Sequence, residues 1–255
     1  QVRLFAPNFA SNTWRRLPIL KAEWRKKYCL QTPLWRHLVM RRPRETTTRV
    51  ALANTSRFFF DKRMRICGSN IQNYLLEKSR VVVLGPGERN YHIFYQLLRG
   101  GSDDLKRNLM LGDLDDYHYI NQSETGVDGM DDVEEWRTLM KSFETLEFTK
   151  KEQNDVLRIT AGVLHMGNIA FKSTGDRKCG VKQRSNLSPA AKLFEVDERQ
   201  LEKVVTTRML RLRGQDPIEV GLSVEEATAA RDALSKFIYE HMFDWLVKRI
   251  NKSIG

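Results

Sequence analysis

Residues 80–94 read RVVVLGPGERNYHIF, and the interpretation of the whole chain starts from this stretch. A β-branched run enters a Gly-Pro-Gly turn and an apparent helix follows, which is the order found in many phosphate-binding loops. Pro86 removes one backbone donor, and Glu88 places a carboxylate where phosphate would lie. Asn90 replaces the third glycine of the G-x-G-x-x-G fingerprint. We therefore interpret the stretch as a strand, a tight turn and a Glu-capped helix that binds no nucleotide.

Hydrophobic periodicity and capping residues predict a mainly helical chain around this stretch. We expect a helix over residues 70–77, a buried strand over 79–84 and a helix over 88–98. Further helices are expected to begin at Asp131 or Asp132, at a Thr149–Glu152 capping box, at Ser188, at Asp197 and at a Ser223–Glu226 capping box. Loops are expected over 100–131, 173–186 and 210–222.

The last predicted helix is long, at about 28 residues or roughly 40 Å. The spacing of its apolar residues predicts one shared face, made of Ala227, Ala230, Leu234, Phe237, His241 and Trp245. The same periodicity predicts an apolar stripe of Val133, Trp136, Leu139 or Met140, Phe143 and Leu146 on the helix after Asp131. On the helix after Asp197 we expect Leu201, Val204 and Val205 to face inward.

Positive charge is concentrated in the first quarter of the chain. Residues 1–66 carry 16 Lys/Arg and 3 Asp/Glu, whereas residues 67–255 carry 27 and 29. Three of the five tryptophans lie in the first part as well. This composition is open to three interpretations: a disordered or foreign leader, an organelle-targeting segment, or a segment that grips nucleic acid or acidic lipid. We favour the leader, since prolines interrupt it and no helical stripe is present, and nucleic acid is the least favoured partner.

Other chemical signals are sparse. The three cysteines lie far apart and form no disulfide framework, which favours a reducing compartment. The five histidines show no metal-ligand spacing. No apolar run is long enough for a membrane span.

Four long motifs carry a family resemblance. YLLEKSRVV (74–82) and GERNYHIFYQLL (87–98) resemble the myosin motor domain, in the part called the upper 50-kDa subdomain. Residues 129–171, which end in HMGNIAF, and ARDALSKFIYEHMFDWLVKRIN (230–251) continue the resemblance in register. It implies an α+β, mainly α-helical fold: an incomplete fragment of the myosin motor, whose P-loop NTPase-like mixed sheet carries large helical insertions. It also implies two parts: residues 1–50 as a basic leader unlike the family, and residues 51–255 as a partial motor domain from the switch I region through the upper 50-kDa subdomain.

The resemblance implies an actin-based motor that couples ATP binding and hydrolysis to movement along actin filaments. Its partners would be the actin filament and the rest of the myosin heavy chain, in the cytoplasm at the cytoskeleton. ATP and Mg²⁺ would serve the complete motor. No loop of the GESGAGKT type and no D-x-x-G-F-E segment occurs here, and we expect a chain truncated at both ends. We therefore expect no intact catalytic residue, no cofactor and no ATP hydrolysis for this chain alone. The alternative is a non-catalytic, myosin-derived, actin-binding remnant.

ANTSRFFF (53–60) is similar to the family's switch I, N-x-N-S-S-R-F-G-K. The resemblance implies that Asn54 shapes the phosphate pocket, that Thr55 lies near the γ-phosphate and that Ser56 places its hydroxyl on Mg²⁺. Arg57 would pair with the switch II glutamate. The match is degenerate, because Leu52 stands for the first asparagine and Phe59-Phe60 for Gly-Lys. Only nine residues separate Phe58 from Gly68, so we expect a strand or hairpin to be missing there. In the whole motor the strand expected near 79–84 would pair with segments that we expect to be absent here, so we also expect open sheet edges and poor solubility.

Residues 211–222 resemble the actin-contacting surface loop of the family, with Arg211, Arg213, Asp216 and Glu219 as candidate contacts. Many myosins carry an acidic or phosphorylatable residue sixteen positions before a D-A-L-x-K motif. The motif begins here at Asp232, so Asp216 occupies that position. A solvated loop aspartate is the alternative interpretation of Asp216.

Overall fold

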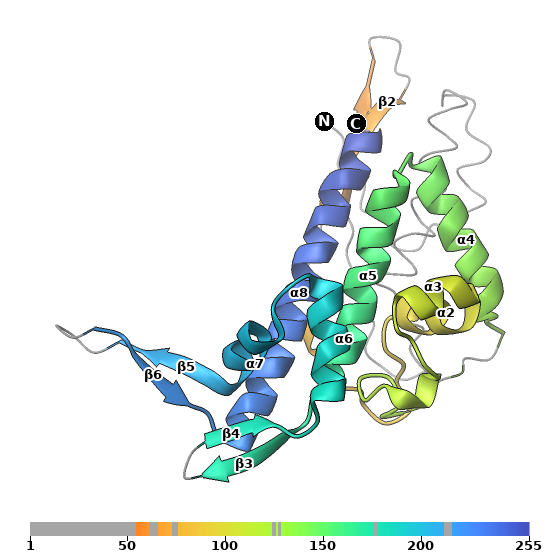
Figure 1. Cartoon of the computed structure of the whole chain (residues 1–255). Coiled ribbons are helices and arrows are strands. Elements are labelled where there is room, and N and C mark those ends of the chain that lie inside the picture. The colour runs from red at the N-terminus through yellow and green to blue at the C-terminus, as the bar shows by residue number, and fades with distance from the viewer. Residues whose placement is uncertain are drawn as a thin grey trace.

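The computed structural model of the chain describes residues 55–61, 66–72, 76–123, 126, 129–175, 178–211 and 216–254 (Figure 1). The α-helices are α2 (His92–Gly100), α3 (Asp103–Asn108), α4 (Asp132–Thr145), α5 (Lys150–Gly167), α6 (Arg184–Phe194), α7 (Glu198–Thr206) and α8 (Val224–Ile254). Short 3₁₀ helices are η2 (Lys78–Val81) and η3 (Leu114–Asp116). The fold is mainly helical, as predicted.

The strands in the described part of the chain form three separate antiparallel pairs. These pairs are β1 (Thr55–Phe60) with β2 (Ile66–Gln72), β3 (Phe171–Gly175) with β4 (Lys178–Val181), and β5 (Thr207–Leu210) with β6 (Ile218–Gly221). The long helix α8 connects them in space, because β1–β2 lies at its C-terminal end and the other two hairpins lie near its N-terminal end (Figure 1).

Two hydrophobic clusters hold the helices together. The larger lies between α2, α4, α5 and the C-terminal half of α8, and Phe94, Phe143, Leu164 and Phe243 are among its fully buried members. The smaller joins α6, α7 and the β3–β4 hairpin to the first turns of α8, through Leu187, Val205 and Ala227. α5 contributes to both clusters, since Leu164 belongs to the first and Met166 to the second.

Four predicted helix starts are confirmed by their capping hydrogen bonds. Asp131 accepts from the backbone N–H of Val133 at 2.8 Å, and Asp197 accepts from that of Arg199 at 3.0 Å. At the start of α5, the backbone N–H of Glu152 donates to the Thr149 hydroxyl at 3.2 Å, and the Glu152 carboxylate accepts from the Thr149 N–H at 2.7 Å. The start of α8 shows the same reciprocal pair between Ser223 and Glu226. Such caps satisfy backbone donors that no helix carbonyl can reach.

The predicted buried strand over 79–84 is wrong, because this segment is the 3₁₀ helix η2 followed by a turn. The cause is the buried guanidinium of Arg80, which binds Glu77 at 2.9 Å and Glu88 at 2.8 Å and so folds the segment back on itself. Val83 is accordingly 62% exposed. Glu88 does not cap a helix either, since α2 begins only at His92.

The helix predicted over 70–77 is also wrong where the structure describes it. Residues up to Gln72 belong to β2, which pairs with β1 from Thr55↔Gln72 onward. β1 and β2 pair directly with each other around the segment in which a strand or hairpin of the family is expected to be missing. The predicted loops over 173–186 and 210–222 likewise contain the β3–β4 and β5–β6 hairpins. α6 begins at Arg184, four residues before Ser188, and tolerates Pro189 in its second turn.

The shared face predicted for α8 is not its buried face at the aromatic positions, since Phe237 is 55% exposed and Trp245 is 40% exposed. The buried face consists of Ala227, Arg231, Ser235, Tyr239, Met242, Phe243, Leu246, Val247, Ile250 and Ile254. Tyr239 is fixed there by stacking on Tyr91, with ring centroids 5.1 Å apart and planes 2° from parallel. Val204, predicted to face inward, is exposed, and so is Val133 at the start of the predicted apolar stripe.

Candidate functional site

The candidate nucleotide residues lie at the C-terminal end of α8. Thr55, Ser56 and Arg57 form the start of β1, opposite Gln72, Ile71 and Asn70 of β2, and the structure describes their backbone only. Asn54 lies outside the described residues. β2 is attached to α8 by the Asn251 side chain, whose Oδ1 accepts from the Ile71 N–H at 2.7 Å and whose Nδ2 donates to the Ile71 carbonyl at 2.9 Å.

The candidate actin-contact residues lie at the opposite end of α8, on the β5–β6 hairpin. Arg211 follows β5, Asp216 precedes β6, and both are exposed. Glu219, within β6, forms an ion pair with Lys203 of α7 at 2.5 Å. Arg213 lies outside the described residues. The hairpin extends away from the helices (Figure 1), so the three described candidates share one projecting element.

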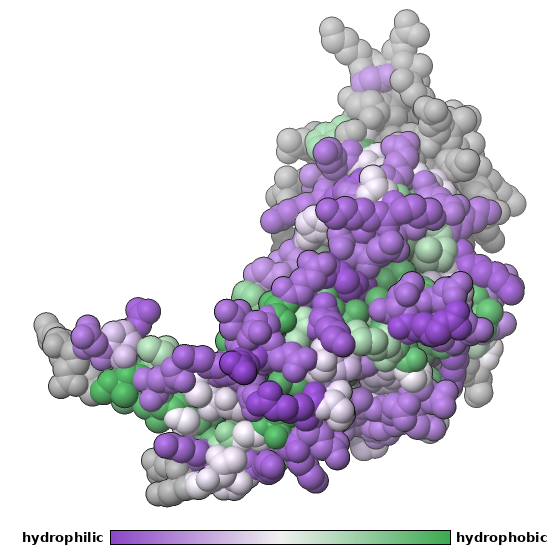
Figure 2. Space-filling view, in the orientation of Figure 1, coloured by the Kyte–Doolittle hydropathy of each residue, from purple (hydrophilic) through white to green (hydrophobic). Residues whose placement is uncertain are grey.

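The surface of this hairpin combines apolar and charged side chains. Met209, Leu210 and Ile218 are 40–55% exposed, and Leu210 lies opposite Ile218 in the strand register. Figure 2 shows the resulting hydrophobic area on the projecting arm, bordered by hydrophilic residues. Exposed apolar side chains rimmed by charges are typical of surfaces that contact other proteins.

Between the two ends, α8 is joined to the C-terminus of α5 by a buried polar network. Arg231 Nη1 donates to the carbonyls of Gly167 at 3.1 Å and Ile169 at 2.9 Å. Asp232 Oδ1 accepts from Arg231 Nη2 and from the Tyr119 hydroxyl, each at 2.7 Å. Burial raises the pKa of Tyr119 well above its usual value, which keeps the hydroxyl protonated as a donor. The sequence motifs at 165–171 and 230–235 therefore meet here, a contact that sequence analysis did not predict.

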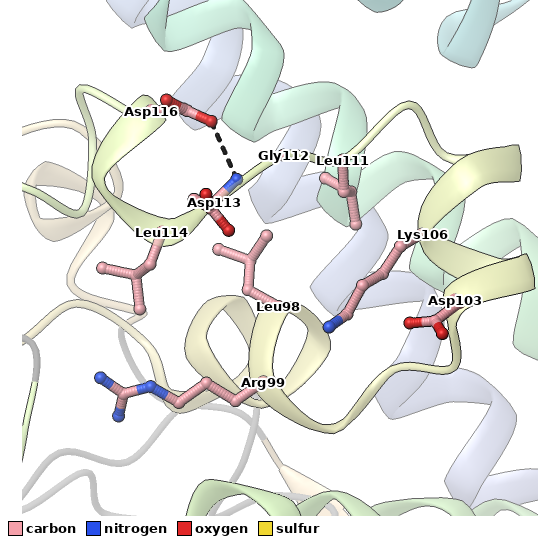
Figure 3. Close-up of a pocket in the computed structure, with 9 residues that line it drawn as sticks. All are labelled: Leu98, Arg99, Asp103, Lys106, Leu111, Gly112, Asp113, Leu114 and Asp116. Carbon is pink, nitrogen blue, oxygen red and sulfur yellow. Dashed lines mark hydrogen bonds between the residues drawn. The ribbon is translucent and has the colours of Figure 1, made fainter.

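A surface pocket of about 500 Å³ opens between α2, α3 and η3 (Figure 3). Its lining residues are Leu98, Arg99, Asp103, Lys106, Leu111, Gly112, Asp113, Leu114 and Asp116. Three leucines give it an apolar floor, and Lys106 and Asp113 approach Leu98 from different sides (Figure 3). None of the candidate nucleotide or actin-contact residues lines it.

Within the described part of the chain, no three His, Cys, Asp or Glu side chains are grouped as metal ligands. The same residues include no helix that is long and apolar enough to cross a membrane.

Comparison with known proteins identifies the family. A sequence profile described as "Myosin head (motor domain)" matches residues 49–255. The chain belongs to the myosin head family. Myosin IB heavy chain of Dictyostelium discoideum is 40% identical over 216 residues, which cover 79% of this chain and 19% of that protein. Myosin-2 of Lachancea kluyveri is 38% identical over 205 residues, 78% of this chain and 13% of that protein.

Myosin-1 of Pyricularia oryzae is 39% identical over 188 residues, covering 73% of this chain and 16% of that protein. The chain thus spans about a fifth or less of the length of these myosins. The resemblance of the quoted motifs to the myosin motor domain is confirmed. The roles of individual residues, from Asn54 to Arg57 and from Arg211 to Glu219, stay predictions.

Proposed function

We propose that the chain forms part of an actin-based myosin motor, which couples ATP binding and hydrolysis to movement along actin filaments at the cytoskeleton. Residues 51–255 supply the part from switch I through the upper 50-kDa subdomain, and residues 1–50 are a leader outside the motor fold. In the complete motor, β1 and β2 belong to a P-loop NTPase-like mixed sheet, and the helices are its insertions. The actin filament and the rest of the heavy chain are the partners.

The observation that carries this proposal is the position of the β5–β6 hairpin. It projects from the body at the start of α8 and exposes charged and apolar side chains together (Figures 1 and 2). Asp216 is exposed and has no ion pair among the described residues, so its charge is available to a basic patch on actin. Glu219 is engaged by Lys203 and plays a lesser part. Arg211 and Arg213 complete the contact.

At the other end of α8, the proposal assigns nucleotide binding to residues 54–57. ATP and Mg²⁺ would bind in the complete motor, with Asn54 shaping the pocket, Thr55 near the γ-phosphate and the Ser56 hydroxyl on Mg²⁺. A hydroxyl oxygen suits this hard cation. Arg57 would form an ion pair with the switch II glutamate, a geometry in which arginine binds carboxylate with two hydrogen bonds.

Co-sedimentation of the 255-residue chain with filamentous actin tests the actin assignment. Asp216→Lys reverses one charge on the hairpin, and we expect it to weaken actin binding several-fold. Glu144→Lys is the matched control, because Glu144 is exposed on α4, far from the hairpin. Equal binding by the parent and both variants would remove Asp216 from the contact, and absence of any actin binding by the parent would contradict the proposal for this chain.

The second candidate function is a non-catalytic, myosin-derived, actin-binding remnant, which the degenerate switch I favours. ATP added to the complete heavy chain separates the two candidates, because a motor changes its actin affinity when nucleotide binds and a remnant does not. A leader that gripped nucleic acid or acidic lipid would instead show binding that falls steeply with salt.

A further inference from the structure

A second pocket, of about 260 Å³, adjoins the one in Figure 3 and shares Gly112 and Asp116 with it. It is enclosed by the loop after α3, the C-terminal end of α5 and the first turns of α6. Its lining residues are Met110, Gly112, Asp116, Tyr117, His165, Asn168, Ser185, Asn186 and Pro189. None of these residues takes part in the proposed actin or nucleotide contacts, so the proposed function assigns no ligand to this pocket.

The imidazole of His165 presents an unpaired acceptor at this pocket. The ring is only 7% exposed, and its Nε2 lies 3.1 Å from the carbonyl oxygen of Leu109. A carbonyl only accepts hydrogen bonds, so Nε2 carries the proton and Nδ1 is the acceptor. Nδ1 has no partner within the described residues. Burial lowers the pKa of His165, which keeps the ring neutral and the Nδ1 lone pair free.

Asp116 supplies a second acceptor and the pocket's only charged side chain. Its Oδ2 accepts from the Asp113 N–H at 2.8 Å, whereas Oδ1 has no partner in the described part of the chain. Figure 3 shows the second carboxylate oxygen pointing away from the first pocket. A Cβ atom at Gly112 would lie 2.4 Å from Oδ2, so the glycine is what allows the carboxylate to sit here.

The remaining polar groups add another acceptor and two hydroxyls. Asn186 donates through Nδ2 to the Asn168 carbonyl at 2.9 Å, which leaves its Oδ1 without a partner among the residues described. The Ser185 and Tyr117 hydroxyls also line the pocket. Tyr117 accepts from the Gly112 N–H at 3.0 Å, so each hydroxyl can still donate its proton or accept a hydrogen bond. The C-terminus of α5 carries a partial negative charge and the N-terminus of α6 a partial positive charge, so the two helix dipoles largely cancel at the pocket. The negative charge of Asp116 therefore favours a positively charged ligand.

Three unpaired acceptors, one of them the carboxylate that is the only charge among the lining side chains, favour a cation with several N–H groups, and the two hydroxyls can accept from such a cation as well. A guanidinium carries five N–H donors in a plane and no acceptor, whereas an ammonium is a compact point charge. We propose that this pocket binds the guanidinium group of an arginine side chain. Two sources share this chemistry: the first 54 residues of the chain, which contain nine arginines and three lysines, or an arginine of another protein.

The test uses the full ¹⁵N-labelled chain and N-acetyl-arginine amide as the probe. NMR shifts of the Asn168 and Asn186 side-chain amides report binding at the pocket itself, and N-acetyl-lysine amide is the comparison ligand. We expect saturable shifts with the arginine probe and at least about fivefold weaker binding of the lysine probe. Asp116→Asn keeps the acceptor for the Asp113 N–H but removes the charge, and should weaken binding about tenfold or more.

Asp115→Asn is the matched control, because it removes the same charge from the neighbouring exposed residue, which lines neither pocket. It should bind the arginine probe within about twofold of the parent, since a solvent-exposed neighbouring charge contributes little. Equal weakening by both variants, or equal binding of both probes, would overturn the proposal.

A variant with all nine arginines of residues 1–54 replaced by glutamine identifies the source. If these arginines occupy the pocket, the Asn186 resonances shift in this variant and it binds the probe more tightly than the parent. If the source is another protein, the two chains bind the probe alike. Absence of saturable binding in both chains would overturn the proposal.

Discussion

The side-chain amide of Asn251 pairs with both backbone polar groups of Ile71, 180 residues earlier in the chain. Its oxygen takes the N–H at 2.7 Å and its nitrogen gives a hydrogen bond to the carbonyl at 2.9 Å, so it continues the β2 ladder as another strand would. Ile71 is 3% exposed, and water therefore cannot replace these bonds. The C-terminal end of α8 is thereby attached to the hairpin that carries the switch I candidate.

Asn251→Ala should loosen β2 without unfolding the helices. Both Ile71 groups would lose their partner while buried, and we expect a loss of about 1–3 kcal/mol in the free energy of local opening. Hydrogen exchange of the Ile71 amide measures this directly. Lys252→Ala, at the exposed neighbouring position, should leave the exchange rate unchanged. Unaltered exchange in Asn251→Ala would show that the amide does not stabilise the strand.

Gly100→Ala should destabilise the packing of α2 on α4. The added Cβ would lie 2.3 Å from the Cβ of Trp136, an atom that cannot move without its backbone. Overpacking of this kind lowers the free energy of unfolding by about 1–3 kcal/mol, which exceeds the helix-propensity gain of about 0.5–1 kcal/mol. Urea denaturation measures the difference. Gly126→Ala is the control, because no atom lies within 4 Å of its added Cβ, and a Gly100→Ala midpoint at or above this control would contradict the argument.

Protonation of His165 should make stability depend on pH below about 6.5, the ordinary pKa of histidine. Burial lowers its pKa in the folded state, so the unfolded chain binds the proton first as pH falls. The free energy of unfolding therefore falls with decreasing pH from about 6.5 down to the lowered pKa, by at most about 1.4 kcal/mol per pH unit. Urea titrations across this range measure the slope.

His165→Gln keeps a donor for the Leu109 carbonyl but cannot titrate, so the slope should become flatter. His118→Gln, at an exposed position, should retain the parent slope. The Glu152 carboxylate does not interfere, because Arg249 lowers its pKa and its contribution is lost only in more acidic solution. An identical slope in the parent and His165→Gln would contradict the assignment.

The chain of 255 residues should not hydrolyse ATP by itself. No G-x-x-x-x-G-K-[ST] loop occurs in the sequence to hold the γ-phosphate, and phosphoryl transfer depends on that positioning. Release of phosphate with Mg²⁺ and ATP measures turnover. Activity above background that disappears in both Ser56→Ala and Arg57→Ala would show that the prediction is wrong.

Local signals in the sequence predicted the helix starts well. Asp131, Thr149, Asp197 and Ser223 each bond to a backbone N–H within three residues, so the pattern and the contact occupy the same short window. The segment at 79–84 was mispredicted because its conformation depends on the Arg80 ion pairs, which β-branched composition does not reveal.

Contacts between residues far apart in the chain could not be predicted from the sequence pattern. α8 has apolar residues on more than one face, so the face that periodicity identified, with Phe237 and Trp245, differs from the buried face that carries Tyr239 and Phe243. The contacts of Arg231 with Gly167 and of Asn251 with Ile71 join residues 64 and 180 positions apart. The candidate switch I and actin-contact positions came from family resemblance alone, since their residue types are ordinary in strands and loops.

α8 contains neither glycine nor proline between Val224 and Ile254, and its 31 residues span about 46 Å without a hinge. A tilt of roughly 5° about the Asn251 end would sweep the hairpin end through about 4 Å. A small change in the angle between α8 and β2 therefore produces a larger displacement of the β5–β6 hairpin, while the helix itself keeps its shape.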